Sequence, residues 1–167
     1  MKRIALFVPV LLIAIITIFS CDNNDLGKLR RIELEELDAF IQSNYPDVQQ
    51  KPSGLYYIET VAGTGDSIKL GDRVQIFYST WTIDSLLIDE TSGFSQGYRY
   101  DPFEFVVGSG GAIAGLEEAA TYMKPGTRAS LVIPSELAYG QNGSASVGGF
   151  TTLLMEVEVY KVYPSEQ

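Results

Sequence analysis

Residues 133–140 read IPSELAYG, and this stretch lies between two segments with the composition of β-strands. Five segments of the chain are rich in β-branched and aromatic residues, namely 55–61, 73–83, 103–107, 127–133 and 152–162. Within the last of them, residues 155–159 read MEVEV, so apolar side chains occupy one face of the strand and glutamates the other. We therefore expect the stretch to follow a strand within an antiparallel sheet.

One segment of this region has a different period. Between residues 112 and 123, the apolar residues Ile113, Leu116, Ala120 and Met123 recur at the spacing of a helix. One helix among several strands predicts an α+β fold, in which a curved antiparallel sheet wraps around one short central helix.

The composition excludes several classes of function. The formal net charge is −9, from 12 basic and 21 acidic side chains, and the chain has one cysteine and no histidine. An acidic surface is repelled by nucleic acid, so we exclude nucleic-acid binding. The lack of histidine excludes serine-histidine catalysis and histidine-ligated metal sites, and a single cysteine cannot form an internal disulfide.

The N-terminus has the layout of a targeting signal. Residues 1–20 read MKRIALFVPVLLIAIITIFS, in which two basic residues precede an apolar run and a small residue, as in a secretory signal peptide. Residues 18–21 resemble a bacterial lipobox, which implies cleavage before Cys21 and lipidation of Cys21. The alternative is an uncleaved membrane anchor, but the apolar stretch 4–19 has 16 residues, whereas a spanning helix needs roughly 20.

The lipobox resemblance also implies a location. Several acyl chains anchor a protein stably to a membrane, so we expect a bacterial cell-envelope protein, with the outer membrane favoured and the leaflet left open. Removal of residues 1–20 would leave ten basic and 21 acidic side chains, a net charge of −11.

Residues 21–54 are predicted to connect the anchor to the main domain. Residues 22–27 are polar and are expected to form a flexible tether, and the segment 28–43 has apolar residues at helical spacing. These apolar residues are Leu29, Ile32, Leu37, Phe40 and Ile41. Two interpretations stay open: a spacer helix that packs on the main domain, or a helix that mediates a homodimer or docks a partner.

Other motifs accompany IPSELAYG in a fixed order. They include GDRV at 71–74, PFEF at 102–105, AIAGLEEA at 112–119 and TLLMEVEV at 152–159. Together these blocks resemble the FKBP domain, which implies that an FKBP-type domain spans residues 55–163, followed by a tail at 164–167. The resemblance implies peptidyl-prolyl cis/trans isomerase activity on the X-Pro bonds of exported proteins.

The absence of histidine is compatible with this chemistry. Rotation about an X-Pro bond faces a barrier of roughly 18–20 kcal/mol from amide resonance, and no bond to the substrate is broken. A catalyst needs a dry apolar cup and a few hydrogen-bond donors that favour the twisted state. No metal or other cofactor is expected.

The resemblance also implies the site residues. It assigns the catalytic positions to Tyr78, Asp89, Phe103, Ile113 and Tyr139. It assigns substrate contacts to Ile88, Ala112, Leu116 and Met155, with Val147 and Phe150 as candidates to cover the site from a neighbouring loop.

The pocket departs from the usual family pattern in its walls. Ile88, Leu116 and Met155 stand where the family often has aromatic residues, so the cup stays apolar but loses flat, rigid surface. The loop 142–150 has two glycines where the family often has two prolines, which predicts a more mobile loop.

The loop 91–101, which reads TSGFSQGYRYD, is longer than in compact members. Its aromatic residues Phe94, Tyr98 and Tyr100 are candidates for additional substrate-contacting surface. The carboxylates of Glu117 and Glu118 fall in the first turns of the central helix, where they favour the helix dipole, and we interpret them as structural.

Three functions remain open at this point. The first is an active isomerase that assists folding in the cell envelope. The second is a catalytically weak or inactive FKBP-like binding or chaperone module. The replacement of aromatic pocket residues by Ile88, Leu116 and Met155 suggests this alternative. The third is a structural envelope lipoprotein, which would bind neither proline-containing polypeptides nor macrolides.

Overall fold

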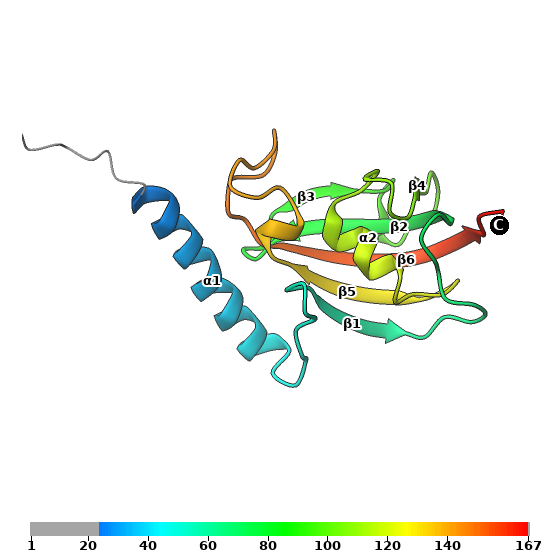
Figure 1. The fold of residues 1–167 in the computed structure, drawn as a ribbon, viewed down its shortest axis with the longest axis horizontal. Helices are drawn as coiled ribbons and strands as arrows, with labels where there is room; N and C mark the ends of the chain where they lie inside the picture. Colours follow the sequence, from blue (N-terminus) through cyan, green and yellow to red (C-terminus); the bar gives the residue numbers. More distant parts are fainter. Residues whose placement is uncertain (1–23, 167) are drawn as a thin grey trace, which may run out of the picture.

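The computed structural model describes residues 24–166. Its elements in chain order are α1 (Asn24–Asn44), β1 (Tyr56–Val61), β2 (Arg73–Thr82), β3 (Leu87–Glu90), η1 (Phe94–Gln96), β4 (Phe103–Val106), α2 (Ala114–Ala120), β5 (Arg128–Ile133), η2 (Ser135–Leu137) and β6 (Leu153–Tyr163). The strands form one six-stranded antiparallel sheet in the order β1-β5-β6-β2-β3, and β4 pairs with β2 beside this path. Figure 1 shows α2 lying across one face of the sheet and α1 set to one side.

The face of the sheet that α2 covers carries the main core. On β6 the buried residues Met155, Val157 and Val159 alternate with glutamates, as the sequence predicts. Gly115 on α2 is required for close approach, because a Cβ atom there would lie 2.5 Å from Cγ2 of Ile133 on β5. The backbone of α2 therefore lies directly against the strand that leads into residues 133–140.

The C-terminal half of α1 packs on the opposite face of the sheet. Leu37 and Ile41 are buried in a second apolar cluster with Tyr56 of β1 and Val132 of β5. Val132 alternates along its strand with Leu131 and Ile133, which belong to the main core, so the two clusters lie on opposite faces. The protein therefore has three layers: α1, the sheet and α2.

The N-terminal half of α1 extends beyond the sheet (Figure 1), and its residues Leu26, Leu29, Ile32 and Leu34 are exposed. The spacer interpretation, in which this helix packs its apolar stripe on the main domain, is thus confirmed for Leu37, Phe40 and Ile41 and wrong for Leu29 and Ile32.

The predicted elements agree with the structure in most places. All five predicted strands are confirmed to within one residue at each end, and the central helix is shorter than the predicted 112–123. The short strand β3 was not predicted. The expected tether at 22–27 is wrong where the structure describes it, since α1 begins at Asn24 and carries Asp25 in its first turn, where a carboxylate favours the helix dipole.

The proposed signal peptide and Cys21 lie outside the described residues. Across residues 24–166, no helix is both long and apolar enough to cross a membrane.

Candidate functional site

A cavity of about 560 Å³ opens on the face of the sheet that α2 covers. Its lining residues are Tyr78, Thr80, Ile88, Asp89, Phe103, Gly111, Ala112, Ile113, Ala114, Leu116, Ala138, Tyr139, Leu153 and Met155. Nine of the eleven residues predicted to form the site therefore lie around one cavity. We call this cavity the proline pocket, after the ring that the predicted chemistry would place in it.

Four of the six strands contribute residues to the proline pocket. β2 supplies Tyr78 and Thr80, β6 supplies Leu153 and Met155, and β3 and β4 supply the remaining strand residues. The register of the sheet explains this, because Thr80 on β2 pairs directly with Met155 on β6. The segment before α2 and the turn after η2 close the other sides.

The pocket has an apolar floor and an aromatic wall. Leu116, Leu153 and Met155 are buried and form part of the main core. The Phe103 ring packs edge-on against Tyr78, with 5.8 Å between ring centroids and 79° between ring planes. Edge-to-face packing of this kind favours a defined ring orientation, so the wall is preorganised.

Tyr78 and Asp89 form the central polar pair of the pocket. The Tyr78 hydroxyl donates a hydrogen bond of 2.6 Å to Oδ2 of Asp89. Burial, followed by this hydrogen bond and the charge of Asp89, raises the pKa of Tyr78 well above its ordinary value of 10. The phenol therefore stays protonated and holds the carboxylate of Asp89 in one orientation.

Two further donors belong to residues that line the pocket. Tyr139 lies at the rim with 41% of its surface exposed, and its hydroxyl has no hydrogen-bond partner within residues 24–166. The N–H of Ile113 precedes the first turn of α2 and also donates to no acceptor in the described part of the chain. Both groups are free to bind a carbonyl oxygen of a ligand.

Glu117 fixes the segment that carries the Ile113 N–H. Its Oε2 accepts a hydrogen bond of 3.0 Å from the N–H of Gly108, and its Oε1 accepts one of 3.2 Å from the N–H of Ala112. Glu118 instead accepts hydrogen bonds from the hydroxyls of Ser53 and Tyr122. Both carboxylates are therefore structural, as predicted.

Glu33 of α1 makes a buried contact with two segments beside the pocket, and the sequence did not reveal it. Its side chain is buried, and its carboxylate accepts hydrogen bonds from the Ser135 N–H (2.7 Å), the Ser135 hydroxyl (2.8 Å) and the Thr152 hydroxyl (3.0 Å). Ser135 begins the turn that leads to Tyr139, and Thr152 precedes Leu153. Glu33 thus ties α1 to two segments that form the pocket.

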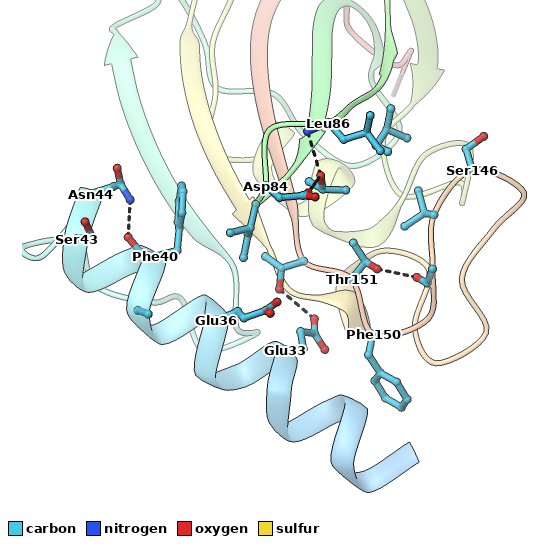
Figure 2. A pocket seen from close by; sticks show the side chains of 17 residues that line it. Glu33, Glu36, Phe40, Ser43, Asn44, Asp84, Leu86, Ser146, Phe150 and Thr151 are labelled. Carbon is cyan, nitrogen blue, oxygen red and sulfur yellow. Dashed lines mark hydrogen bonds between the residues drawn. The ribbon is translucent and has the colours of Figure 1, made fainter. Parts of the chain in front are cut away.

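The structure places Val147 and Phe150 outside the proline pocket, so the expectation that they cover it is wrong. The loop doubles back on itself: the Phe150 N–H donates to the Gly140 carbonyl at 2.9 Å, and a Cβ atom on Gly149 would lie 2.1 Å from the Gln141 carbonyl oxygen. This tight path buries Val147 in the main core and directs Phe150 toward α1 (Figure 2).

The loop 91–101 also stays outside the pocket. Phe94 stacks on Phe77, which points away from the pocket face, and Arg99 lies 4.2 Å from the centroid of the Phe94 ring. Tyr98 and Tyr100 are exposed, and neither lines the pocket.

No group of three or more histidine, cysteine, aspartate or glutamate side chains within residues 24–166 is arranged to hold a metal ion. What the pocket offers chemically is an apolar cup, a fixed tyrosine–carboxylate pair and two free donors. Such a site can bind an apolar ring beside a carbonyl group without any covalent step.

Comparisons with known proteins agree with this geometry. The family model described as FKBP-type peptidyl-prolyl cis-trans isomerase matches residues 65–160. The FKBP-type 22 kDa peptidyl-prolyl cis-trans isomerase of Escherichia coli is 38% identical over 116 residues, which are 69% of this chain and 53% of that protein. The peptidyl-prolyl cis-trans isomerase Mip of Coxiella burnetii is 34% identical over 131 residues, covering 77% of this chain and 54% of Mip. The chain spans about half the length of these curated relatives.

Solved structures are similar over most of the chain. A peptidyl-prolyl cis-trans isomerase from Pseudomonas syringae superposes with a TM-score of 0.70 at 26% identity, covering 83% of this chain and 96% of that one. FkpA from Escherichia coli gives a TM-score of 0.71 at 29% identity, covering 86% of this chain and 63% of FkpA.

Proposed function

Because the chain belongs to the family of FKBP-type peptidyl-prolyl cis-trans isomerases, we propose that its proline pocket catalyses rotation about X-Pro bonds of polypeptides. The observation that carries the proposal is the convergence of Tyr78, Asp89, Phe103, Ile113 and Tyr139 on one apolar cavity. These residues come from three strands, a helix start and a turn, so the sheet topology is what assembles them.

The pocket would act by favouring the twisted amide. Rotation removes amide resonance, which sets the barrier, and only interactions that are stronger in the twisted state lower it. The floor of Leu116, Leu153 and Met155 holds the proline ring and excludes water. The N–H of Ile113 and the Tyr139 hydroxyl donate to substrate carbonyls, while the fixed charge of Asp89 keeps carbonyl oxygens away from its side of the pocket.

The experiment is the cis-to-trans conversion of a short X-Pro peptide at low temperature by residues 22–167. Uncatalysed exchange takes tens of seconds or longer, so even weak catalysis is measurable. We expect acceleration by the wild-type chain and a clear loss of turnover in Phe103→Ala and Tyr139→Phe. Unchanged turnover in both variants would show that this pocket is not the site.

A second candidate function is a binding or chaperone module with little isomerase activity. Aliphatic or thioether side chains at Ile88, Leu116 and Met155 favour it, because they give a proline ring less rigid surface than aromatic walls do. If the folded chain binds proline peptides in the pocket but does not accelerate cis/trans exchange of their X-Pro bonds, this second function is supported over the first.

We further propose that the chain is held at the bacterial cell envelope, in the outer membrane, by lipid on Cys21, and acts there on exported polypeptides. The support is the signal-peptide layout of residues 1–20 and the lipobox-like sequence at 18–21. The mass of the N-terminal peptide tests it: Cys21 should carry acyl chains, and Cys21→Ser should release the protein from the membrane fraction. An unmodified Cys21 in a membrane-bound protein would contradict the proposal.

A homodimer through α1 is proposed on a separate observation. Leu26, Leu29 and Ile32 are spaced by three residues on the half of α1 that extends beyond the sheet, and all three are exposed. Sedimentation should show a dimer that dissociates in Leu29→Glu, whereas a monomeric wild-type chain would refute it.

A further inference from the structure

A second cavity, of about 770 Å³, lies beside the proline pocket and has no part in the function proposed above. Three elements surround it: the C-terminal half of α1, the turn between β2 and β3, and the loop 146–152. Figure 2 shows Glu33 and Glu36 projecting from α1 toward this loop, with Asp84 and Leu86 on the opposite turn. We call this space the helix-side cavity.

The helix-side cavity adjoins the proline pocket. Ile88 of β3 lines both cavities. Thr152, which lines the helix-side cavity, directly precedes Leu153, which lines the pocket. An extended polypeptide advances about 3.3 Å per residue. A side chain about three or four residues from a bound proline therefore lies roughly 10–13 Å away, which suits two cavities that share a wall.

The helix-side cavity combines apolar surface with negative charge. Phe40, Leu86, Val147 and Phe150 supply apolar surface, and the only charged residues in the lining are Glu33, Glu36 and Asp84. No lysine or arginine lines it. A lysine or arginine side chain has matching chemistry, because its long apolar stem packs on hydrophobic surface while its cationic head stays near water and acidic groups.

The three carboxylates differ in availability. Glu33 is committed to Arg30, Ser135 and Thr152. Asp84 accepts a hydrogen bond from the Thr82 hydroxyl and retains further lone pairs. Glu36 is exposed and has no hydrogen bond or ion pair within residues 24–166. Glu36 is therefore the carboxylate best placed to receive a cationic ligand.

We propose that the helix-side cavity binds a lysine or arginine side chain of the same polypeptide whose proline occupies the pocket. The inference rests on the proposed function, since it extends the substrate site of that function. It makes α1 part of substrate recognition, with Glu36 as the specificity-determining residue.

The test uses a series of peptides with one Ala-Pro bond and one lysine about two to six residues from the proline, on either side. Otherwise identical peptides carry glutamine or glutamate in place of the lysine. For the full chain in mild detergent, we expect one lysine position to raise kcat/KM over the glutamine peptide by about two- to fivefold, the range for an exposed ion pair. This preference should shrink as salt is added.

Two variants distinguish the effect of the cavity on the lysine preference from the effect of the protein's overall negative charge. In Glu36→Gln, the lysine-to-glutamine ratio of kcat/KM should fall toward one. Glu35→Gln removes the same charge from an exposed position on the same helix that lines neither cavity, and it should keep the wild-type ratio. No lysine preference in the wild type, or an equal loss of preference in both variants, would overturn the proposal.

Failure of the proposed function is recognised separately. If the wild-type chain accelerates none of the peptides, fluorescence anisotropy of labelled lysine and glutamine peptides still measures binding. Tighter binding of the lysine peptide that depends on Glu36 would support the cavity without an isomerase. Equal binding of both peptides would refute it.

Discussion

At the scale of single residues, the pocket depends on a few side chains whose environment fixes their chemistry. Tyr78 illustrates this, because the same contact that orients Asp89 also keeps the Tyr78 phenol protonated. The raised pKa places its titration above that of a free tyrosine, so this donor persists throughout the neutral and mildly alkaline range.

Tyr78→Phe tests this pair. Removal of the hydroxyl leaves Asp89 without its donor and costs about 1 kcal/mol of net hydrogen-bond energy. We expect kcat/KM on a short X-Pro peptide to fall about fivefold, with the far-UV circular dichroism spectrum unchanged. Wild-type activity should show no alkaline decline due to Tyr78 between about pH 7 and 9. Full activity in Tyr78→Phe would mean that Asp89 does not need this contact.

Glu33 gives a prediction about stability and pH. Burial raises the pKa of Glu33, but hydrogen bonds from Ser135, Arg30 and Thr152 together outweigh burial, so its pKa lies below the ordinary 4.5. Because the pKa of Glu33 is lower in the folded state, the contribution of its charged form to the free energy of unfolding is fully present above the pKa of the unfolded state. It is lost as the pH falls through the folded pKa.

We therefore expect Glu33→Gln to lower the free energy of unfolding by about 1–3 kcal/mol at pH 7, measured by urea denaturation. The difference from wild type should shrink below about pH 4.5, where the wild-type carboxylate also begins to protonate. Glu35→Gln, an exposed change on the same helix, is the matched control and should have little effect. A destabilisation that is constant from pH 7 to pH 3 would contradict the role of the charge.

The residues of the pocket were largely predictable, and Glu33 was not. Tyr139 and Phe103 sit in short motifs whose order is visible in the sequence, and the structure brings them to one cavity. Glu33 contacts residues about a hundred positions away, and no local pattern marks such a contact. Phe150 was misplaced because the path of its loop depends on close backbone approaches at glycine, which residue types alone do not specify.

At the scale of elements, the periodicity of apolar residues predicted the long, regular strands and missed the short one. The long strand β6 alternates cleanly and was found, whereas β3 has only four residues and none of them is fully buried. The segment 112–123 has a helical period, but α2 covers only Ala114–Ala120. At its N-terminal end, Glu117 accepts hydrogen bonds from the N–H groups of Gly108 and Ala112 and so holds the preceding residues in a loop.

Gly115 tests the packing of α2 on β5. Gly115→Ala should gain about 1 kcal/mol in helix propensity, yet its Cβ atom would meet Ile133 at 2.5 Å. Overpacking of this kind costs about 1–3 kcal/mol, so we expect net destabilisation in urea denaturation. Gly115→Ala combined with Ile133→Ala should be more stable than the sum of the single changes predicts, by about 0.5 kcal/mol or more. Strict additivity would show that the contact is not the cause.

At the scale of the whole molecule, α1 is joined to a domain that the family model covers only from residue 65 onward. It packs Leu37 and Ile41 on the sheet, fixes Ser135 through Glu33, and forms a wall of the helix-side cavity. These three contacts make α1 a layer of the folded unit, so it should fold and unfold together with the sheet.

This cooperativity can be observed with two probes in one urea titration. α1 has 21 helical residues and α2 has seven, so the helical signal in circular dichroism reports mainly on α1. Trp81, the single tryptophan, lies on β2 and lines a small cavity with Phe40 and Tyr45 at the C-terminal end of α1, so its fluorescence reports on the sheet and on helix docking. We expect both signals to change at the same urea concentration. A chain that begins at residue 45 should lose about 3 kcal/mol or more, because burial of each large apolar side chain contributes roughly 1.5–3 kcal/mol. A helical signal that disappears at lower urea than the Trp81 signal would instead make α1 an independent arm, and the argument that it helps to shape the substrate site would fail with it.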